Sequence, residues 1–320
     1  MQSVRVGWIY DRRFLQHDTG EDHPESPARL VAIVNAVEQA GLLSQLVALP
    51  FRQASSAELT LAHDPAYVDL VRMMCDAGFS FVGSRETRIC RQSYDIAALA
   101  AGGVLAACEA VMAGHITRAF CAVRPPGHHA EFDAAMGYCL FNHVAIAAEH
   151  LVRNHGLTRV AIVDFDVHHG NGTQHFFAER NDVLYISLHE RPGSIGFPGT
   201  GEADEIGSGA GAGYTLNVPL NRGSGPREYL AALAQHVEPA LTAFRPEFLL
   251  LSAGFDALMW DNSSNLNLQP GTYGALTDSL VQIAARHAQG RVVSVLEGGY
   301  HIPQLGAAVV AHILAMSEEE

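Results

Sequence analysis

The chain of 320 residues is 48% hydrophobic and only 17% charged, which is enough apolar material for a substantial core. Its formal net charge of −14 argues against a nucleic-acid partner, which requires clustered lysine and arginine, and permits attraction of cationic substrates such as lysine side chains or polyamines. Its five cysteines form no Cys-x-x-Cys pair, and no stretch is expected to act as a signal peptide or to cross a membrane. We therefore expect a cytoplasmic protein that has no membrane partner.

Apolar segments that predict strands alternate along the chain with helical patterns. The predicted strands cover residues 4–9, 119–123, 159–164, 183–188, 215–218, 248–253 and 291–296. The predicted helices cover residues 27–40, 65–75, 93–113, 140–154, 227–244 and 271–288. This alternation predicts a single α/β domain over residues 1–320, in which helices cover both faces of a mainly parallel sheet. Uneven spacing favours an open sheet over a TIM barrel, with long active-site loops at the carboxyl ends of the strands.

The segment after the predicted strand 159–164 is the richest in chemistry, because two carboxylates and two imidazoles precede a glycine turn there. Asp166 and His168 alternate with Val167, so an extended backbone would point both side chains to one side. This spacing predicts metal ligands at a strand end. A helix cap followed by solvated histidines is the alternative.

Two further strand ends carry side chains that suit catalysis. Asp256 follows strand 248–253 and would complete a set of three ligands, the pattern of a catalytic rather than a structural metal site. Zn²⁺ fits such a set, and Fe²⁺ is also admitted. His128 and His129 follow a rigid Pro-Pro-Gly turn and are candidate general acids or bases. Tyr300, after two glycines, is a weaker candidate for a hydrogen-bond donor.

Six segments together resemble the zinc-dependent histone deacetylase family: RPPGHH, DFDVHHGNGTQ, SLHE, FPGTGE, SAGFDA and EGGY. The similarity is strongest to the class II branch and to bacterial deacetylase and acetylpolyamine amidohydrolase relatives, and it covers nearly the whole chain from His23 onward. It implies the arginase–deacetylase fold. It also implies a hydrolase of linear amides that removes acetyl or other acyl groups from the ε-amine of lysine.

The resemblance assigns a role to each matching residue. It implies that zinc is held by Asp166, His168 and Asp256. It implies that His129 is the general base and then the acid, beside the catalytic residues His128, Asp164, Asn171 and Tyr300. It implies substrate contacts from Gly137, Tyr138, Phe197 and Glu86. It implies structural potassium at an inner site of Asp164, Asp166, His168, Ser187 and Leu188, and at an outer site near Phe177, Arg180, Val183 and Tyr214.

One departure from the family pattern bears on the substrate. Ser263 stands seven residues beyond Asp256, where polyamine-specific members carry a gatekeeper glutamate. The sequence therefore gives no support for strict polyamine selectivity, and the small side chain leaves room for longer acyl groups.

Three alternatives remain. The first is a deacetylase of acetylated polyamines or of another small amide. The second is an arginase-like enzyme with two metals, although Phe255 and Ala257 stand where further carboxylates would be needed. The third is a non-catalytic acyl-lysine binding protein, against which the intact motifs argue. The sequence leaves the oligomeric state open, a homo-oligomer included.

Overall fold

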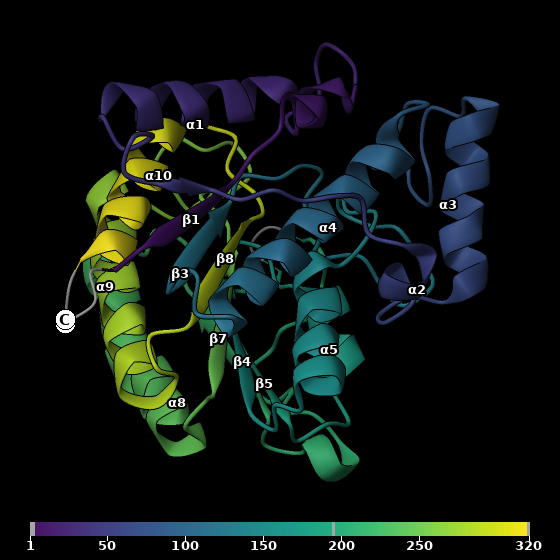
Figure 1. The fold of residues 1–320 in the computed structure, drawn as a ribbon. Helices are drawn as coiled ribbons and strands as arrows, with labels where there is room; N and C mark the ends of the chain where they lie inside the picture. Colours follow the sequence, from purple (N-terminus) through teal and green to yellow (C-terminus); the bar gives the residue numbers. More distant parts are fainter. Residues whose placement is uncertain (1–3, 194–195, 319–320) are drawn as a thin grey trace.

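The computed structural model describes residues 4–193 and 196–318, and its strands form one eight-stranded sheet in the order β2-β1-β3-β8-β7-β4-β5-β6. All neighbouring strands in this sheet are parallel (Figure 1). Residues 1–3, 194–195 and 319–320 lie outside the described residues, so part of the loop predicted over 190–212 and both ends of the predicted domain are not described.

The strands confirm the predicted pattern with shifts of a few residues at their ends. Their bounds are β1 (Val6–Ile9), β2 (Val47–Ala48), β3 (Arg118–Cys121), β4 (Val160–Asp164), β5 (Val183–Glu190), β6 (Thr215–Leu220), β7 (Phe248–Ala253) and β8 (Val292–Leu296). The central strands β4, β5, β7 and β8 are buried along their whole length, which is why they are continuous apolar runs. Only β2 was not predicted, because two residues carry no periodic signal.

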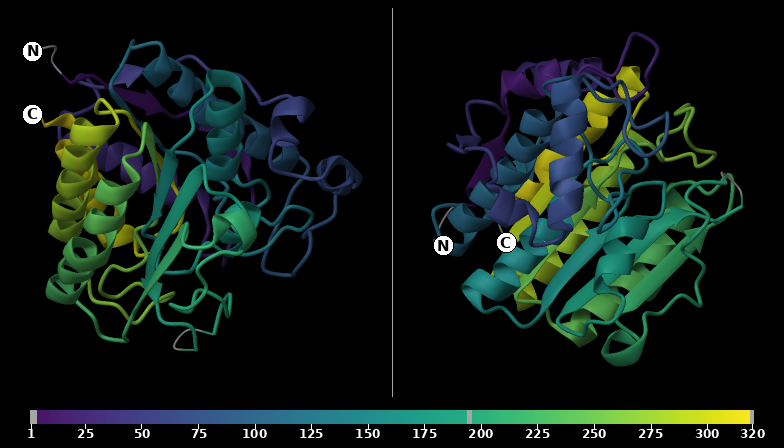
Figure 2. Two further views of the ribbon diagram at one scale, coloured as in Figure 1. Left: turned by 90° about the horizontal axis from the view of Figure 1, so that it is seen from below. Right: turned by 90° about the vertical axis from the view of Figure 1, so that its right-hand side faces the viewer.

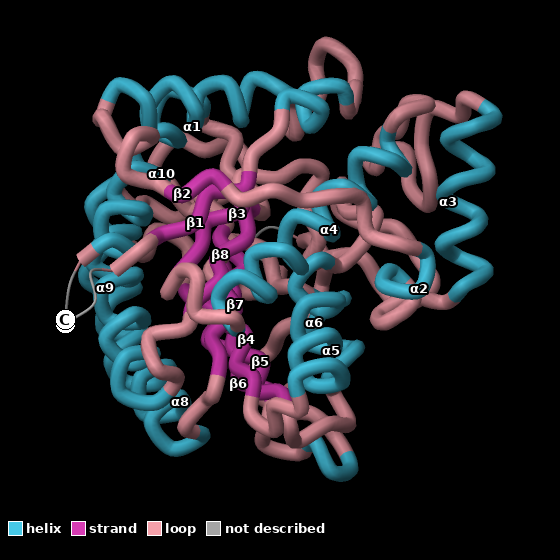
Figure 3. Tube along the Cα trace, in the orientation of Figure 1, coloured by secondary structure: helices cyan, strands magenta, loops and turns pink. Residues whose placement is uncertain are grey.

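Helices cover both faces of the sheet, as predicted. Their bounds are α1 (Pro27–Gln39), α2 (Ser56–Leu59), α3 (Pro65–Ala77), α4 (Ser93–Met112), α5 (His143–His155), α6 (Asn171–Phe177), α7 (Pro226–Ala232), α8 (Glu238–Phe244), α9 (Pro270–His287) and α10 (Ile302–Ser317). Helices α1, α8, α9 and α10 lie on one side, and α4 and α5 lie on the other with α2 and α3 outside them (Figures 1 and 3). Figure 2 shows the same layers from below and from the side.

The helix predictions are wrong at one place and miss three helices, α2, α6 and α10. The helix predicted over 227–244 is interrupted by a π-helical turn, Leu233–Val237, between α7 and α8. Pro239 lacks the N–H that an α-helix would direct at the carbonyl of Gln235, so the wider turn fits there. Helix α10 packs against both α1 and α9 and is therefore apolar on most sides. It was not predicted, because its sequence lacks the alternation of apolar and polar residues that marks a helix with one buried face.

Helix α4 corrects the expectation that no stretch is long enough to cross a membrane. By length and hydropathy alone, residues 93–112 meet that criterion. However, 72% of the apolar window is buried within the fold, where α4 packs on β1, β3 and β8 beside α5. The apolar length of α4 therefore serves the core.

Candidate active site

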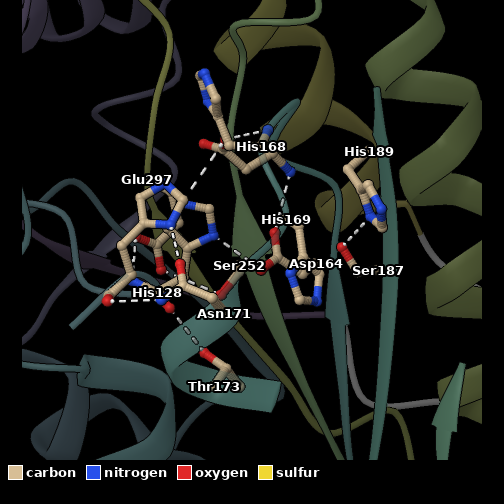
Figure 4. A network of polar contacts seen from close by, with 12 residues as sticks. His128, Asp164, His168, His169, Asn171, Thr173, Ser187, His189, Ser252 and Glu297 are labelled. Atoms are coloured by element: carbon tan, nitrogen blue, oxygen red, sulfur yellow. Dashed lines mark hydrogen bonds and ion pairs between the residues drawn. The ribbon is translucent and has the colours of Figure 1, made fainter. Parts of the chain in front are cut away.

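The loops that carry the predicted chemistry meet at one edge of the sheet. The sheet order sets β3, β8, β7 and β4 side by side, and parallel strands end at the same edge. The loops that follow these strands contribute His128 and His129, Tyr300, Asp256, and the segment from Asp166 to His168. Side chains from four distant parts of the sequence thus come together at this edge. Figure 4 shows the polar network around His128 and His168, which Asp164, Ser252 and Glu297 join from the ends of β4, β7 and β8.

Asp166, His168 and Asp256, which we call the buried triad, have their potential ligand atoms within 4.8 Å of one another. His168 Nδ1 lies 3.1 Å from Asp166 Oδ1 and 3.3 Å from Asp256 Oδ2. The extended backbone predicted for Asp166 and His168 is wrong, since β4 ends at Asp164 and both residues lie in the bent loop beyond it. The loop nevertheless brings the two side chains to the same point.

Backbone N–H groups hold the two carboxylates of the buried triad in place. Gly298 N–H donates to Asp166 Oδ2 over 2.8 Å, and Val167 N–H donates to Asp256 Oδ1 over 2.9 Å. A Cβ atom on Gly298 would collide with Asp256 Oδ2, so only glycine allows this close approach. These contacts fix one oxygen of each carboxylate and aim the other at His168.

The buried triad has the properties expected of a cation site. Both carboxylates are almost fully buried, and Asp256 Oδ2 is among the described buried atoms that lack a hydrogen bond of good geometry. Burial, together with the neighbouring Asp166 carboxylate, raises the pKa of Asp256 to about 7. Although burial disfavours the charged ring, the same two carboxylates raise the pKa of His168 to about 10. A divalent cation would take the place of the proton that His168 holds between them and would use the free oxygen. One imidazole and two carboxylates therefore fit Zn²⁺ chemically.

His128 and His129 lie side by side, with ring centroids 3.9 Å apart, but they have different partners. His128 Nδ1 donates to Asp164 Oδ2 over 2.9 Å. Although burial disfavours the charged ring, the carboxylates of Asp164, Asp166 and Glu297 raise the pKa of His128 to about 10. This histidine is therefore a fixed cation.

His129 has the opposite character. Burial and the neighbouring His128 hold the pKa of His129 well below its ordinary value, so the ring is neutral. Its Nδ1 lies 2.8 Å from the amide oxygen of Asn171 and donates to it, which leaves Nε2 free to accept a proton. Asn171 in turn contacts Glu131, which pairs with the half-exposed His175. Glu131 and His175 were not predicted.

A cavity of about 510 Å³ opens above His129 and His168. The predicted substrate residues Gly137, Tyr138, Phe197, Glu86 and Ser263 all line it, together with Tyr300. Its lining also includes residues that the sequence did not indicate: Pro24, Trp260, Asn262 and His301. Phe197 packs edge-on to the His129 ring at 4.8 Å, and Tyr138 packs edge-on to Tyr300 at 6.0 Å, so aromatic walls lead down to the two histidines.

Tyr300 is held by residues that were not predicted. Asp261 Oδ2 accepts the backbone N–H groups of Tyr300 and His301 over 2.7 and 2.9 Å. The guanidinium of Arg29 lies 4.9 Å from the Tyr300 ring centroid. Burial raises the pKa of Tyr300 well above its ordinary value, so the hydroxyl remains protonated and can donate. Asp261 lies two residues before Ser263, where the chain departs from the family pattern, but its spacing gives no hint of this contact.

Glu297 is a second buried acid that the sequence did not single out for a role. Its Oε2 accepts the N–H groups of Gly127 and His128, and its Oε1 accepts the Ser252 hydroxyl over 3.1 Å. Burial raises the pKa of Glu297 to about 7. Its position directly after β8, in the same stretch as Tyr300, is the only signal the sequence offers. Glu297 thus ties the histidine loop to the ends of β7 and β8.

The residues assigned to potassium lie in two places around β5. Asp164 and Ser187 are opposite each other in the β4–β5 register, with Leu188 next along the strand and Asp166 and His168 beyond β4. Phe177, Arg180 and Val183 lie between the end of α6 and the start of β5, and Tyr214 precedes β6. The Tyr214 carbonyl accepts the N–H of Tyr185 over 3.0 Å. Each set is thus gathered locally.

Comparison with known proteins bears on the identity of this site. The histone deacetylase domain matches residues 23–316. The chain is 39% identical over 310 residues to the histone deacetylase-like amidohydrolase of Pseudomonas aeruginosa, which covers 96% of this chain and 79% of that protein. It is 39% identical over 305 residues to the human polyamine deacetylase HDAC10, which covers 91% of this chain and 44% of that protein. The crystal structure of the HDA15 HD domain matches with a TM-score of 0.93 at 36% identity, covering 98% of this chain and 88% of that one.

Proposed function

The chain belongs to the histone deacetylase family of amide hydrolases, and from this premise we propose that it removes acetyl or other acyl groups from the ε-amine of lysine with the help of Zn²⁺. One observation carries the proposal. His168 of the buried triad, the neutral His129 and Tyr300 line the same cavity of about 510 Å³. A ligand set, a proton acceptor and a hydroxyl donor thus meet at the floor of one aromatic-walled cavity.

In the proposed enzyme, Asp166, His168 and Asp256 hold the metal. Bound Zn²⁺ supplies Lewis acidity, which lowers the pKa of water and polarises an amide carbonyl. The free Oδ2 of Asp256 supports this assignment. The same donor set admits Fe²⁺. Within the described chain, the potential ligand group at this place contains these three residues alone, which disfavours the arginase-like alternative with two metals.

His129 moves the proton. Its Nε2 accepts a proton from the attacking water, while Nδ1 keeps its hydrogen bond to Asn171. The same Nε2 then donates that proton to the departing amine. Asp164 holds His128 in its charged form. The charge of His128 keeps His129 neutral before the reaction and favours release of the proton that His129 takes up during it.

Tyr300 and the aromatic walls position the substrate. Tyr138 and Phe197 enclose a space in which the apolar stem of an acyl-lysine can lie. The protonated hydroxyl of Tyr300 donates to the oxygen that gains negative charge as the amide carbonyl is attacked. The contacts from Asp261 to the backbone keep this hydroxyl in the cavity.

An acetylated polyamine is the second candidate substrate, because a human relative is named a polyamine deacetylase. Such a substrate carries a free ammonium group that calls for a carboxylate in the cavity wall. Among the described lining residues only Glu86 carries one, at the exposed mouth, whereas Ser263 donates its hydroxyl to Asp261 over 2.6 Å. This favours acyl-lysine as the main substrate.

We also propose that structural K⁺ binds at the two groups of residues around β5. Residues 1–320 form one deacetylase domain in this proposal. The protein works in the cytoplasm, without nucleic-acid or membrane partners. The five free cysteines support a reducing compartment. The non-catalytic alternative is set aside, because the relatives are deacetylases and amidohydrolases.

The proposal is tested by the turnover of an ε-acetyl-lysine peptide and of N-acetylputrescine, each measured before chelation, after chelation and after zinc is added back. Activity on the peptide that is lost and restored with zinc supports the proposal. Turnover of the polyamine alone assigns the protein to the small-amide branch. The absence of zinc-dependent turnover on both compounds, and on longer acyl-lysine peptides, would overturn the proposal.

A further inference from the structure

A second group of possible metal ligands lies on the helices α4 and α5, far along the chain from the residues of the active site. Glu109 of α4 and His150 and His155 of α5, which we call the helix-pair triad, have ligand atoms within 4.8 Å of one another. Glu109 Oε1 lies 2.6 Å from His150 Nε2 and 3.0 Å from His155 Nε2. Both imidazoles therefore point at the same carboxylate oxygen.

The surroundings of the helix-pair triad favour a cation. The triad lies in the last turn of α4 and the last two turns of α5, where the helix dipoles present partial negative charge. Among the described ion pairs, those of Glu109 are with the two imidazoles, so no lysine or arginine occupies its carboxylate. The His150 side chain is 8% exposed, His155 21% and Glu109 53%, so the group is partly covered but open to ions.

His150 uses both ring nitrogens, as a metal-bound histidine does. Nε2 faces Glu109, where the metal would lie, and Nδ1 faces the Asn154 side chain. Asn154 Nδ2 donates to His150 Nδ1 over 2.9 Å, so Nε2 carries the hydrogen that Glu109 accepts. If that hydrogen moves to Nδ1 and the Asn154 amide turns over, Nε2 is free for a metal and Nδ1–H donates to the Asn154 oxygen. Metal-bound histidines usually make such a bond to a carbonyl.

We propose that the helix-pair triad binds a divalent cation of the Zn²⁺ class, with Glu109, His150 and His155 as ligands and water in the remaining position. A tetrahedral ion needs ligands about 2.0–2.2 Å from the metal, which places ligand atoms about 3.3 Å or more from one another. Glu109 Oε1 and His150 Nε2, now 2.6 Å apart, must therefore separate by roughly 0.7 Å. The exposed Glu109 side chain has the freedom to move. The ion would join α4 to α5.

This second site lies away from the active site. α5 ends at His155 and leads directly into the start of β4, and α4 ends at Met112 shortly before β3 begins. The ends of both helices therefore lie at the edge where the strands begin, opposite to the edge that holds the buried triad. Metal at the helix-pair triad should accordingly affect stability and leave catalysis unchanged.

The test counts zinc ions by calorimetric titration of the protein whose first equivalent of zinc is already bound. We expect the unaltered chain to bind a second equivalent, and we expect Glu109→Gln and His155→Gln to bind only the first with full deacetylase activity. His115→Gln is the matched control, because His115 is exposed beside the same helices but lies outside the triad, and it should keep the second equivalent. Saturating the second site should raise the thermal midpoint by about 3 °C, and only in proteins with an intact triad.

The Asp256→Asn variant separates this inference from the proposed function, because it should lose the active-site zinc and keep the helix-pair site. Co²⁺ titrated into that variant should give the visible absorption of a four-coordinate ion, and adding Glu109→Gln should abolish it. A chain that binds no second equivalent of zinc overturns the inference. So does a second equivalent that persists in both Glu109→Gln and His155→Gln.

Discussion

The buried triad and the helix-pair triad contain the same kinds of side chain in opposite proportions. The first has one imidazole and two carboxylates, and the second has two imidazoles and one carboxylate. In the buried triad, backbone N–H groups hold one oxygen of each acid, and an oxygen of Asp256 is left without a good donor. In the helix-pair triad, both imidazoles already satisfy the single carboxylate.

These hydrogen bonds show how a metal site used for catalysis differs from one that only stabilises the fold. In the buried triad an oxygen of Asp256 is left without a hydrogen bond and is available to a cation, whereas the single carboxylate of the helix-pair triad already accepts from both imidazoles. The buried triad also lies beside His129, which can accept a proton, and Tyr300, which can donate a hydroxyl hydrogen. We assign no such groups to the helix-pair triad. We therefore expect tight binding and catalysis at the first, and weaker binding with a stabilising effect at the second.

The largest effect is expected from Asp256→Asn, which changes the carboxylate whose Oδ2 lacks a hydrogen bond of good geometry. Zinc at one equivalent should no longer be retained, and kcat/KM should fall by about a thousand-fold, because Lewis-acid stabilisation supplies several kcal/mol. Activity and zinc content are the measurements, and Glu109→Gln is the matched control at the other triad. Comparable losses in both variants would remove the distinction between the two sites.

The next largest effect is expected from Tyr300→Phe. Loss of the hydroxyl should lower kcat by about a hundred- to a thousand-fold, because one donor to the developing oxyanion is removed. Zinc content should not change, since Tyr300 is not among the predicted ligands. Retained turnover would exclude Tyr300 from the reaction.

A smaller effect is expected from Asp261→Asn, which tests whether the support of Tyr300 matters. Asparagine has only one accepting oxygen, so it cannot accept both the N–H groups of Tyr300 and His301 and the two donors of Ser263 that Asp261 accepts with its other oxygen. Tyr300 should therefore be less well placed, and kcat should fall about ten-fold with little change in zinc affinity. Ser263→Ala is the matched control, because it removes only the hydroxyl that donates to Asp261. Equal losses in the two variants would contradict a positioning role.

The last prediction concerns the stability of the fold and an imidazole that belongs to neither triad. The ring nitrogens of His312 lie 2.6 and 2.8 Å from the hydroxyls of Thr277 and Ser294, and burial lowers the pKa of His312 to about 3. Between pH 6.5 and about 4 the unfolded chain binds a proton at this residue and the folded chain does not. Stability should therefore fall as the pH falls, by about 1.4 kcal/mol per pH unit for this group.

Denaturant unfolding across this pH range measures the slope. His312→Phe removes the titrating group, so its unfolding free energy should depend less steeply on pH than that of the unaltered chain, whatever its absolute stability. An unchanged slope would show that His312 takes up its proton in the folded protein.

That Asp166, His168 and Asp256 lie together could be predicted from the sequence, because strand ends constrain side chains strongly. Asp256 is far from Asp166 in the chain, yet both follow apolar strands, and parallel strands end at a common edge. The prediction of an extended backbone at Asp166 and His168 was wrong, but the bent loop still brings their side chains together. Tyr300 was a weak candidate on its own and gained its role from the resemblance.

Other features could not be predicted, for physical reasons that differ among them. The contacts of Asp261 and Glu297 depend on which strands are neighbours in the sheet, and the sequence does not give that order. Helix α10 lacks a one-sided apolar pattern because two helices cover it. The helix-pair triad depends on how α4 and α5 are rotated about their axes, and short-range periodicity does not fix the partner of each helix face.

The most direct test of the account is to locate the metal in crystals of the protein loaded with one equivalent of zinc. Anomalous diffraction at the zinc edge should give one strong peak in contact with Asp166, His168 and Asp256. A second peak at Glu109, His150 and His155 should appear only when zinc is in excess. A single peak at the helix-pair triad, or a buried triad that stays empty, would contradict the account.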